Sequence, residues 1–254
     1  MRTALYTPLG VTLGILFVFQ GLFAVHAAEP SCQFQKQIEE LAIKKKLSGS
    51  DSLTRIREEL TVRKNLLRDI IDCATREAET LKEKLSMLTL YDQDTARAQT
   101  RLADELSKTI SFYGRERVRI NDVGLRASQD TARSIREWRR GNYASLADQT
   151  VNFIIWANNQ DLMKTAERRL AELHGTVKTV KLSESEDIGT LVKKAREHLT
   201  AALSENERAR KTFIDDALRG ARNPSLSLAS IKSSLQSLAE TYQTFFDLRK
   251  LLKE

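Results

Sequence analysis

The chain has 254 residues, of which 41% are hydrophobic, 30% charged and 6% aromatic. This composition excludes an intrinsically disordered chain and is typical of a globular or coiled-coil protein. The formal net charge of +7 is a modest excess. It favours weak contact with an anionic membrane surface or cell-wall polymer without selecting either.

The first 27 residues have the three parts of a secretory signal peptide. Arg2 gives a positive start, an apolar run covers residues 9–25, and Val25 and Ala27 fit the small-residue cleavage pattern. We therefore expect cleavage after Ala27, with Ala28 as the alternative site, and a periplasmic or extracellular mature protein. The alternative is an uncleaved membrane anchor, although a run of roughly 17 residues is at the short end for spanning a bilayer.

Two cysteines, Cys32 and Cys73, follow the leader. An even number of cysteines in an exported protein indicates a disulfide. Gly49 marks a turn between them, and the helices expected on its two sides have similar reach, about 25 and 33 Å. We predict that Cys32 and Cys73 pair and tie the N-terminus to the second helix. Two unpaired buried thiols are the alternative.

Beyond the leader, apolar residues recur at intervals of three, four and seven positions, a pattern that predicts helices. The expected fold is all-α, an elongated antiparallel helical bundle with coiled-coil-like packing. About six helices are expected, over residues 32–46, 52–89, 95–140, 143–173, 183–219 and from 224 to the C-terminus.

The second of these helices carries the clearest heptad seam. Its members are Leu53, Leu60, Leu67, Ala74, Leu81 and Leu88. A similar seam follows positions 228–252, and the two seams can pair within one chain or between two copies, so homo-oligomerisation stays open. Leucines and a phenylalanine also coincide at a shift of 133 residues, as in Leu66 and Leu199. This leaves an internal duplication as an alternative.

Capping residues predict where the helices begin and end. Residues 91–94 suit a turn with an N-cap, Gly141 and Gly220 suit helix ends, and Asn223 before Pro224 suits a helix start. His174 is expected as a cation at the end of a helix.

The domain boundaries are predicted from the same capping and helix-breaking residues. Residues 28–254 are expected to form one helical domain. An alternative is a division into residues 28–174 and 183–254. Polar and apolar residues alternate over 175–182, and this pattern predicts an extended linker. Ser183 with Glu186 forms a capping-box pattern after it.

The sequence contains no HExxH, GxSxG, P-loop or GxGxxG pattern. His174 and His198 have no partner at a metal-ligand spacing, so we predict no catalytic residue, metal site or cofactor. Adjacent carboxylates are interpreted as solvated helix faces, since neighbouring positions on a helix point about 100° apart. These pairs are Glu39–Glu40, Glu58–Glu59, Asp104–Glu105 and Asp215–Asp216.

Residues 115–140 are rich in arginine and contain no lysine. Guanidinium groups bind carboxylates and phosphates bidentately, so this segment is a candidate surface for an anionic partner. The candidate residues are Arg115, Arg117, Arg119, Arg133, Arg136, Arg139 and Arg140. The competing interpretation is a solvated helix face whose arginines pair with acidic neighbours.

These observations predict an exported, non-enzymatic interaction or scaffold protein that binds a protein partner in the cell envelope. Nucleic acid is not expected, because no aromatic residues are interleaved with the arginines. The alternatives are a periplasmic chaperone that clamps unfolded clients and a membrane-tethered envelope protein with its N-terminal helix retained. A cell-wall hydrolase is a fourth hypothesis, and it predicts a concave pocket with a carboxylate of raised pKa.

Overall fold

A computed structural model describes residues 34, 38–43, 53–90, 92–179 and 185–251. The all-α prediction is confirmed: the described residues are helical apart from short turns, and none forms a strand. Among these helices, none combines the length and hydropathy that a membrane crossing requires. The leader, Cys32 and most of the predicted helix over 32–46 lie outside the described residues, although residues 38–43 are helical.

Within the described ranges, six long α-helices and one short π-helical segment build the fold. The α-helices are α3 (Leu53–Ser86), α4 (Gln93–Arg119), α5 (Leu125–Trp138), α6 (Ala144–Thr179), α7 (Glu186–Arg219) and α8 (Pro224–Leu251). The π-helical segment η1 (Arg139–Tyr143) joins α5 to α6. Because the residues flanking η1 keep helical backbone angles, α5, η1 and α6 form one continuous rod of about 80 Å.

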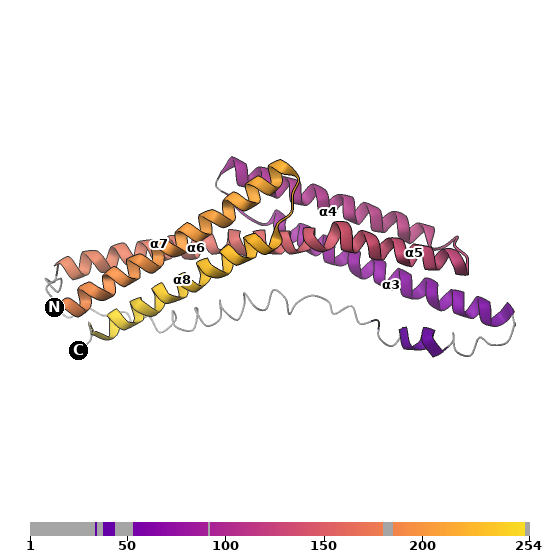
Figure 1. Cartoon of the computed structure of the whole chain (residues 1–254), viewed down its shortest axis with the longest axis horizontal. Coiled ribbons are helices and arrows are strands. Elements are labelled where there is room, and N and C mark those ends of the chain that lie inside the picture. The colour runs from indigo at the N-terminus through magenta and orange to yellow at the C-terminus, as the bar shows by residue number, and fades with distance from the viewer. Residues whose placement is uncertain (1–33, 35–37, 44–52, 91, 180–184, 252–254) are drawn as a thin grey trace, which may run out of the picture.

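The molecule is elongated and consists of two three-helix bundles that share this rod (Figure 1). The hairpin α3–α4 packs against α5 and η1, and the hairpin α7–α8 packs against α6. The two bundles meet where α4 contacts α7 and α3 contacts α6. From Leu67 and from Leu228 onwards, the described residues of the two seams are buried or half-buried within the chain, and Leu81 of one seam lies in the same core cluster as Ile231 of the other. The alternative division into residues 28–174 and 183–254 would place α6 in one part and α7 and α8 in the other. The structure packs α6 against α7 and α8, so the two bundles do not meet at that division.

One predicted helix, over 95–140, proved to be two. The chain reverses after α4 through residues 120–124, where Ile120 and Val123 are buried. Asn121 anchors this turn: its carbonyl accepts a hydrogen bond from Lys64 Nζ at 2.8 Å, and its side chain accepts one from Arg68 at 2.9 Å. The run Asn-Asp-Val-Gly has the composition of a turn. The apolar periodicity continues on both sides of it, and for that reason a single helix was predicted.

The predicted helix end at Gly141 was also wrong. The backbone passes from α5 through η1 into α6 without a break. A π-helical turn accommodates one extra residue within a helix, and Gly141 is exposed there with open space around it. No proline follows that would stop the helix.

The extended linker predicted over 175–182 is helical as far as Thr179, and the remainder lies outside the described residues. Val177 is buried against Ile188, Val192 and Leu248. This packing outweighs the strand preference of the β-branched residues. His174 is consequently inside α6 and does not cap it, and the N-cap of α7 is Ser185.

Other helix ends agree with the predictions. The N-cap predicted within residues 91–94 is Asp92, whose Oδ1 accepts hydrogen bonds from the backbone nitrogens of Asp94 and Thr95 at 3.1 and 2.9 Å, so α4 begins at Gln93, two residues before the expected start. Gly220 ends α7 with φ of 68°, in the left-handed region that favours glycine. Pro224 is the first residue of α8.

The Asp92 cap predicts a pH dependence. Desolvation alone would raise the pKa of Asp92, but hydrogen bonds from Arg210 and Thr95 outweigh it and lower the pKa from 3.8 to about 2. A lowered pKa gives stability that is present above the unfolded value and lost as the pH falls towards 2. We expect the free energy of unfolding to decrease more steeply from pH 4 to 2 in the wild type than in D92N, as measured by urea denaturation. Identical slopes would contradict this prediction.

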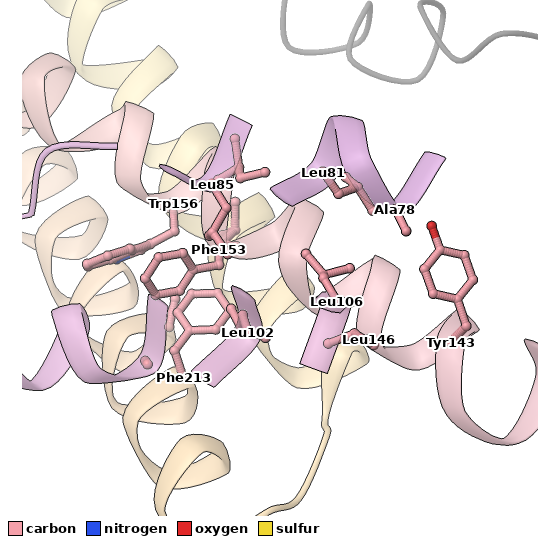
Figure 2. Packing of buried hydrophobic residues seen from close by; sticks show 14 residues of the cluster. Ala78, Leu81, Leu85, Leu102, Leu106, Tyr143, Leu146, Phe153, Trp156 and Phe213 are labelled. Carbon is pink, nitrogen blue, oxygen red and sulfur yellow. The ribbon is translucent and has the colours of Figure 1, made fainter. Parts of the chain in front are cut away.

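The main core lies where the two bundles meet. Figure 2 shows Phe153 and Trp156 of α6 beside Phe213 of α7. The ring centroids of Phe153 and Phe213 are 5.1 Å apart, with an interplanar angle of 77°. Leu85 and Leu106 are fully buried in the same cluster. Segment 151–156 is apolar on several faces because α3, α4, α7 and α8 surround it.

The contact between α7 and α8 depends on small side chains. Ala195, Ala202 and Ala209 recur every seven residues on α7 and are fully buried. On α8 the most buried positions include Ser234 and Thr241, so the predicted seam of large apolar residues flanks the contact and does not form its centre. Ser234 Oγ donates a hydrogen bond to the Ala202 carbonyl at 2.8 Å. The two helices can approach this closely because no large side chain separates them.

The seam on α3 is buried over only part of its length. Leu67, Ala74 and Leu81 are buried, whereas Leu53 is 72% exposed and Leu60 is half-buried.

The internal duplication stays a hypothesis. Helices α3 and α7 both contain 34 residues, and their starts differ by the shift seen in the sequence. At that shift, however, buried Ile71 corresponds to exposed Ser204, and buried Ala78 to exposed Lys211. The two hairpins therefore bury different faces at this alignment.

Candidate interaction surface

The seven predicted arginines lie at the C-terminal end of α4, on α5 and in η1. Arg115, Arg117 and Arg119 belong to α4. Arg133 and Arg136 belong to α5, and Arg139 and Arg140 open η1. These arginines fall into three groups: two pair with another helix, two pair weakly with their own helix, and three form no ion pair with a described residue.

Two of these arginines bind carboxylates of α3 in a bidentate fork, in which two guanidinium nitrogens contact the two carboxylate oxygens. Arg117 Nε lies 2.5 Å from Asp72 Oδ1, and its Nη2 lies 3.1 Å from Asp72 Oδ2. Arg139 Nη1 lies 2.9 Å from Glu77 Oε2, and its Nη2 lies 3.4 Å from Glu77 Oε1. The hydrogen bond to Asp72 raises the pKa of Arg117. Burial would lower the pKa of Arg139, but Glu77 outweighs it and the pKa is raised. These two arginines join helices of the same bundle.

Two other arginines have weaker partners on their own helices. Arg119 Nη1 is 3.8 Å from Glu116, and Arg133 Nη1 is 3.7 Å from Asp130. The side chains of Arg119 and Arg133 are 60% and 69% exposed. Arg133 and Asp130 are both exposed, and such a pair contributes little to stability, so Arg133 can exchange Asp130 for another anion. Arg119, by contrast, lies beside the buried carboxylate of Glu116.

The remaining three, Arg115, Arg136 and Arg140, are exposed and form no ion pair with another described residue. Arg136 and Arg140 are four residues apart and share a helix face with Arg133. Arg126, seven residues before Arg133, lies on the same face and is also exposed. We call Arg126, Arg133, Arg136 and Arg140 the arginine stripe. The sequence interpretation of a single arginine surface was thus too broad.

Beneath η1 lies a buried aromatic cluster. Trp138 stacks on Phe112 with centroids 4.2 Å apart, and Tyr113 and Tyr143 meet edge to face at 6.1 Å. Arg139 lies 5.3 Å from the centroid of the Tyr143 ring. Burial raises the pKa of both tyrosines. Neither phenolic oxygen has a hydrogen-bond partner among the described residues. The cluster holds α5 in place and orients the arginine stripe away from the core.

A second polar cluster lies where the bundles meet, and it corrects the interpretation of the carboxylate pairs. Asp216 is only 4% exposed. Its carboxylate accepts hydrogen bonds from Gln149 Nε2 at 2.9 Å and from Asn223, through N at 2.9 Å and Nδ2 at 2.8 Å. Glu59 is also buried, beside Arg63. Asp215 is exposed as expected. Packing against other helices, which a single-helix pattern does not contain, decides that Glu59 and Asp216 are buried while Glu58 and Asp215 are exposed.

A small cavity of about 90 Å³ adjoins Asp216. Its polar lining includes Arg101, which donates to the Ala217 carbonyl, and Arg222, which lies 3.0 Å from Glu105 Oε2. A hydrogen bond from Lys108 lowers the pKa of Glu105, the direction opposite to that predicted for a hydrolase acid. No histidine lines this cavity.

The histidines and Cys73 lie away from these clusters. His198 Nδ1 is 2.9 Å from Glu240 Oε2, between α7 and α8, and His174 is exposed on α6. In the described ranges, no three His, Cys, Asp or Glu side chains are placed to share a metal ion. Cys73 is buried on α3. Because Cys32 lies outside the described residues, the disulfide between them stays a prediction.

Fold and surface together define an elongated all-α protein with two three-helix bundles on one shared rod. Comparison with known proteins gives no match: no family model, curated protein or solved structure is significantly similar to the chain.

Proposed function

We propose that this chain is an exported, non-enzymatic interaction protein of the cell envelope that binds a protein partner through its helix surfaces. The observation that carries the proposal is the shared rod, α5–η1–α6, which places two bundles end to end and gives a long exposed surface. The arginine stripe lies on this rod. The signal-peptide pattern in residues 1–27 supports export.

The intact mass of protein purified from its native cell tests the location. We expect the mature chain to begin at Ala28. Treatment with iodoacetamide in denaturing urea, without a reductant, should leave the mass unchanged, because Cys32 and Cys73 are bonded. After treatment with dithiothreitol, two carbamidomethyl groups should be added. C73A provides the matched control, since its remaining thiol should react without reduction. A full-length mass would favour the anchored alternative, and labelling before reduction would exclude the disulfide.

One observation favours the chaperone as a second candidate. A groove of about 430 Å³ runs between α6 and α7, and its lining includes Leu170, Leu199 and Leu203. Leu170 and Leu203 are half-buried in this groove, beside Glu167 and Arg196, and such partly exposed leucines are suited to apolar segments of an unfolded client. Suppression of aggregation of a urea-denatured outer-membrane protein by wild type, and its loss in L170E, would support this function. No suppression would leave the interaction protein as the better proposal.

A further inference from the structure

The arginine stripe is a linear array of positive charge on the outward side of α5 and η1. It extends over about 21 Å from Arg126 to Arg140. Arg126, Arg136 and Arg140 form no ion pair with any described residue, and Arg133 has only the long contact of 3.7 Å with Asp130. The opposite side of α5 carries the buried residues Ser128, Thr131 and Ile135. The buried side of α5 therefore packs in the bundle, and its opposite side exposes the guanidiniums to solvent.

The outward face of α5 does not have the features of a membrane-binding or base-stacking surface. Its exposed positions are all polar or charged: Arg126, Gln129, Asp130, Arg133, Arg136 and Glu137. A helix that lies in a bilayer interface buries an apolar face in the acyl region, but the apolar side of α5 packs in the bundle. Binding of single-stranded nucleic acid uses exposed aromatic rings, whereas Trp138 is half-buried in a stack with Phe112.

The acidic residues beside the arginine stripe favour a polypeptide partner over a uniformly anionic surface. Asp130 and Glu137 are exposed and are seven residues apart, so they lie along one edge of the stripe. A uniformly anionic surface would repel both carboxylates. A polypeptide can place carboxylates opposite the arginines and cations opposite Asp130 and Glu137.

The neighbouring forks show the geometry that such a contact would take. Arg117 and Arg139 each bind a carboxylate of the adjacent helix α3 through two nitrogens. Asp72 and Glu77 supply these carboxylates from the same helix, five residues apart. A guanidinium is well suited to this bidentate contact, and a lysine is not. The same chemistry is available to the arginine stripe from outside the chain.

We propose that the arginine stripe docks an acidic α-helix of a partner protein whose carboxylates recur every three to four residues along one face. The proposal rests on the proposed function and names the partner chemistry for it. Arg126, Arg136 and Arg140 supply the free guanidiniums, and Arg133 exchanges Asp130 for a partner carboxylate. Asp130 and Glu137 set the register by accepting cations from the edge of the partner helix.

The test uses two fluorescent peptides of identical composition and the full mature chain. In one peptide, glutamates occupy one helix face, and in the other they are distributed over all faces. Fluorescence anisotropy at low salt should show about tenfold tighter binding of the one-face peptide. The triple variant R126Q/R136Q/R140Q should lose this preference, and added salt should weaken binding by the wild type. Equal binding of both peptides would overturn the proposal.

The matched control is R97Q/R168Q/R208Q, which removes the same charge from exposed positions on α4, α6 and α7. This variant should bind like the wild type, and circular dichroism should show the same helix content for both variants. Tighter binding to phosphatidylglycerol vesicles or polyphosphate than to the one-face peptide would also overturn the proposal. The peptide result does not depend on cellular location, so a failure of export in the mass experiment would be seen separately.

Discussion

Replacement of Asp216 by alanine should lower the free energy of unfolding by about 3 kcal/mol, because Gln149 would be left with a buried, unpaired donor and Asn223 would lose both of its hydrogen bonds to the carboxylate. For a chain of this size, that loss corresponds to a fall in Tm of about 6–12 °C. D216N should also destabilise the protein, since its amide group would face the donors of Gln149 and Asn223. Urea denaturation and thermal melting would measure both variants.

Asp215 provides the matched control for this prediction. It is the adjacent residue on α7 but is exposed, so D215A should change the free energy of unfolding by less than about 0.5 kcal/mol. Equal effects of D215A and D216A would show that the buried cluster does not stabilise the junction of the bundles.

The second large effect is expected at the close contact of α7 and α8. Ala202 is fully buried, and its carbonyl accepts the hydrogen bond from Ser234 Oγ. A leucine at position 202 would push the helices apart and break that hydrogen bond, with an expected loss of about 3 kcal/mol. Chemical denaturation of A202L measures the loss.

For A202L the neighbouring alanine serves as the control. Ala201 lies on the exposed side of α7, and leucine is nearly as good a helix former as alanine. We expect A201L to unfold at nearly the same urea concentration as the wild type. If A202L were equally neutral, the two helices would have to be further apart than the structure shows.

Helix type and the principal caps could be predicted because they depend on local sequence. The predicted helix over 52–89 agrees with α3, and Asp92, Gly220 and Pro224 act where their local chemistry indicated. Of the boundaries that were wrong, those at 120–124 and 175–179 could not be predicted, because packing decides them. The turn at 120–124 is fixed by Lys64 and Arg68 of another helix. The helix continues through 175–179 because Val177 packs on α7 and α8.

The candidate surface was predicted only as a region. The sequence shows a run of arginines, but Arg117 and Arg139 are satisfied by Asp72 and Glu77, which are 45 and 62 residues away. Such distant partners have no signal in a single sequence. Arg126 was left out of the predicted set, although its spacing of seven from Arg133 could have identified it. The buried state of Asp216 likewise depends on Gln149, 67 residues earlier.

The π-helical segment η1 gives the rod one spare residue at one place. Because a π-helical turn accommodates an extra residue within a helix, loss of a single residue between 139 and 143 would return η1 to α-helical pitch and leave α5 and α6 facing as they do now. Loss of a single residue from the middle of α6 has no such reserve, and it would rotate the two sides of the deletion by about 100° relative to each other. Single-residue deletions are therefore expected to be better tolerated in η1 than elsewhere along the rod.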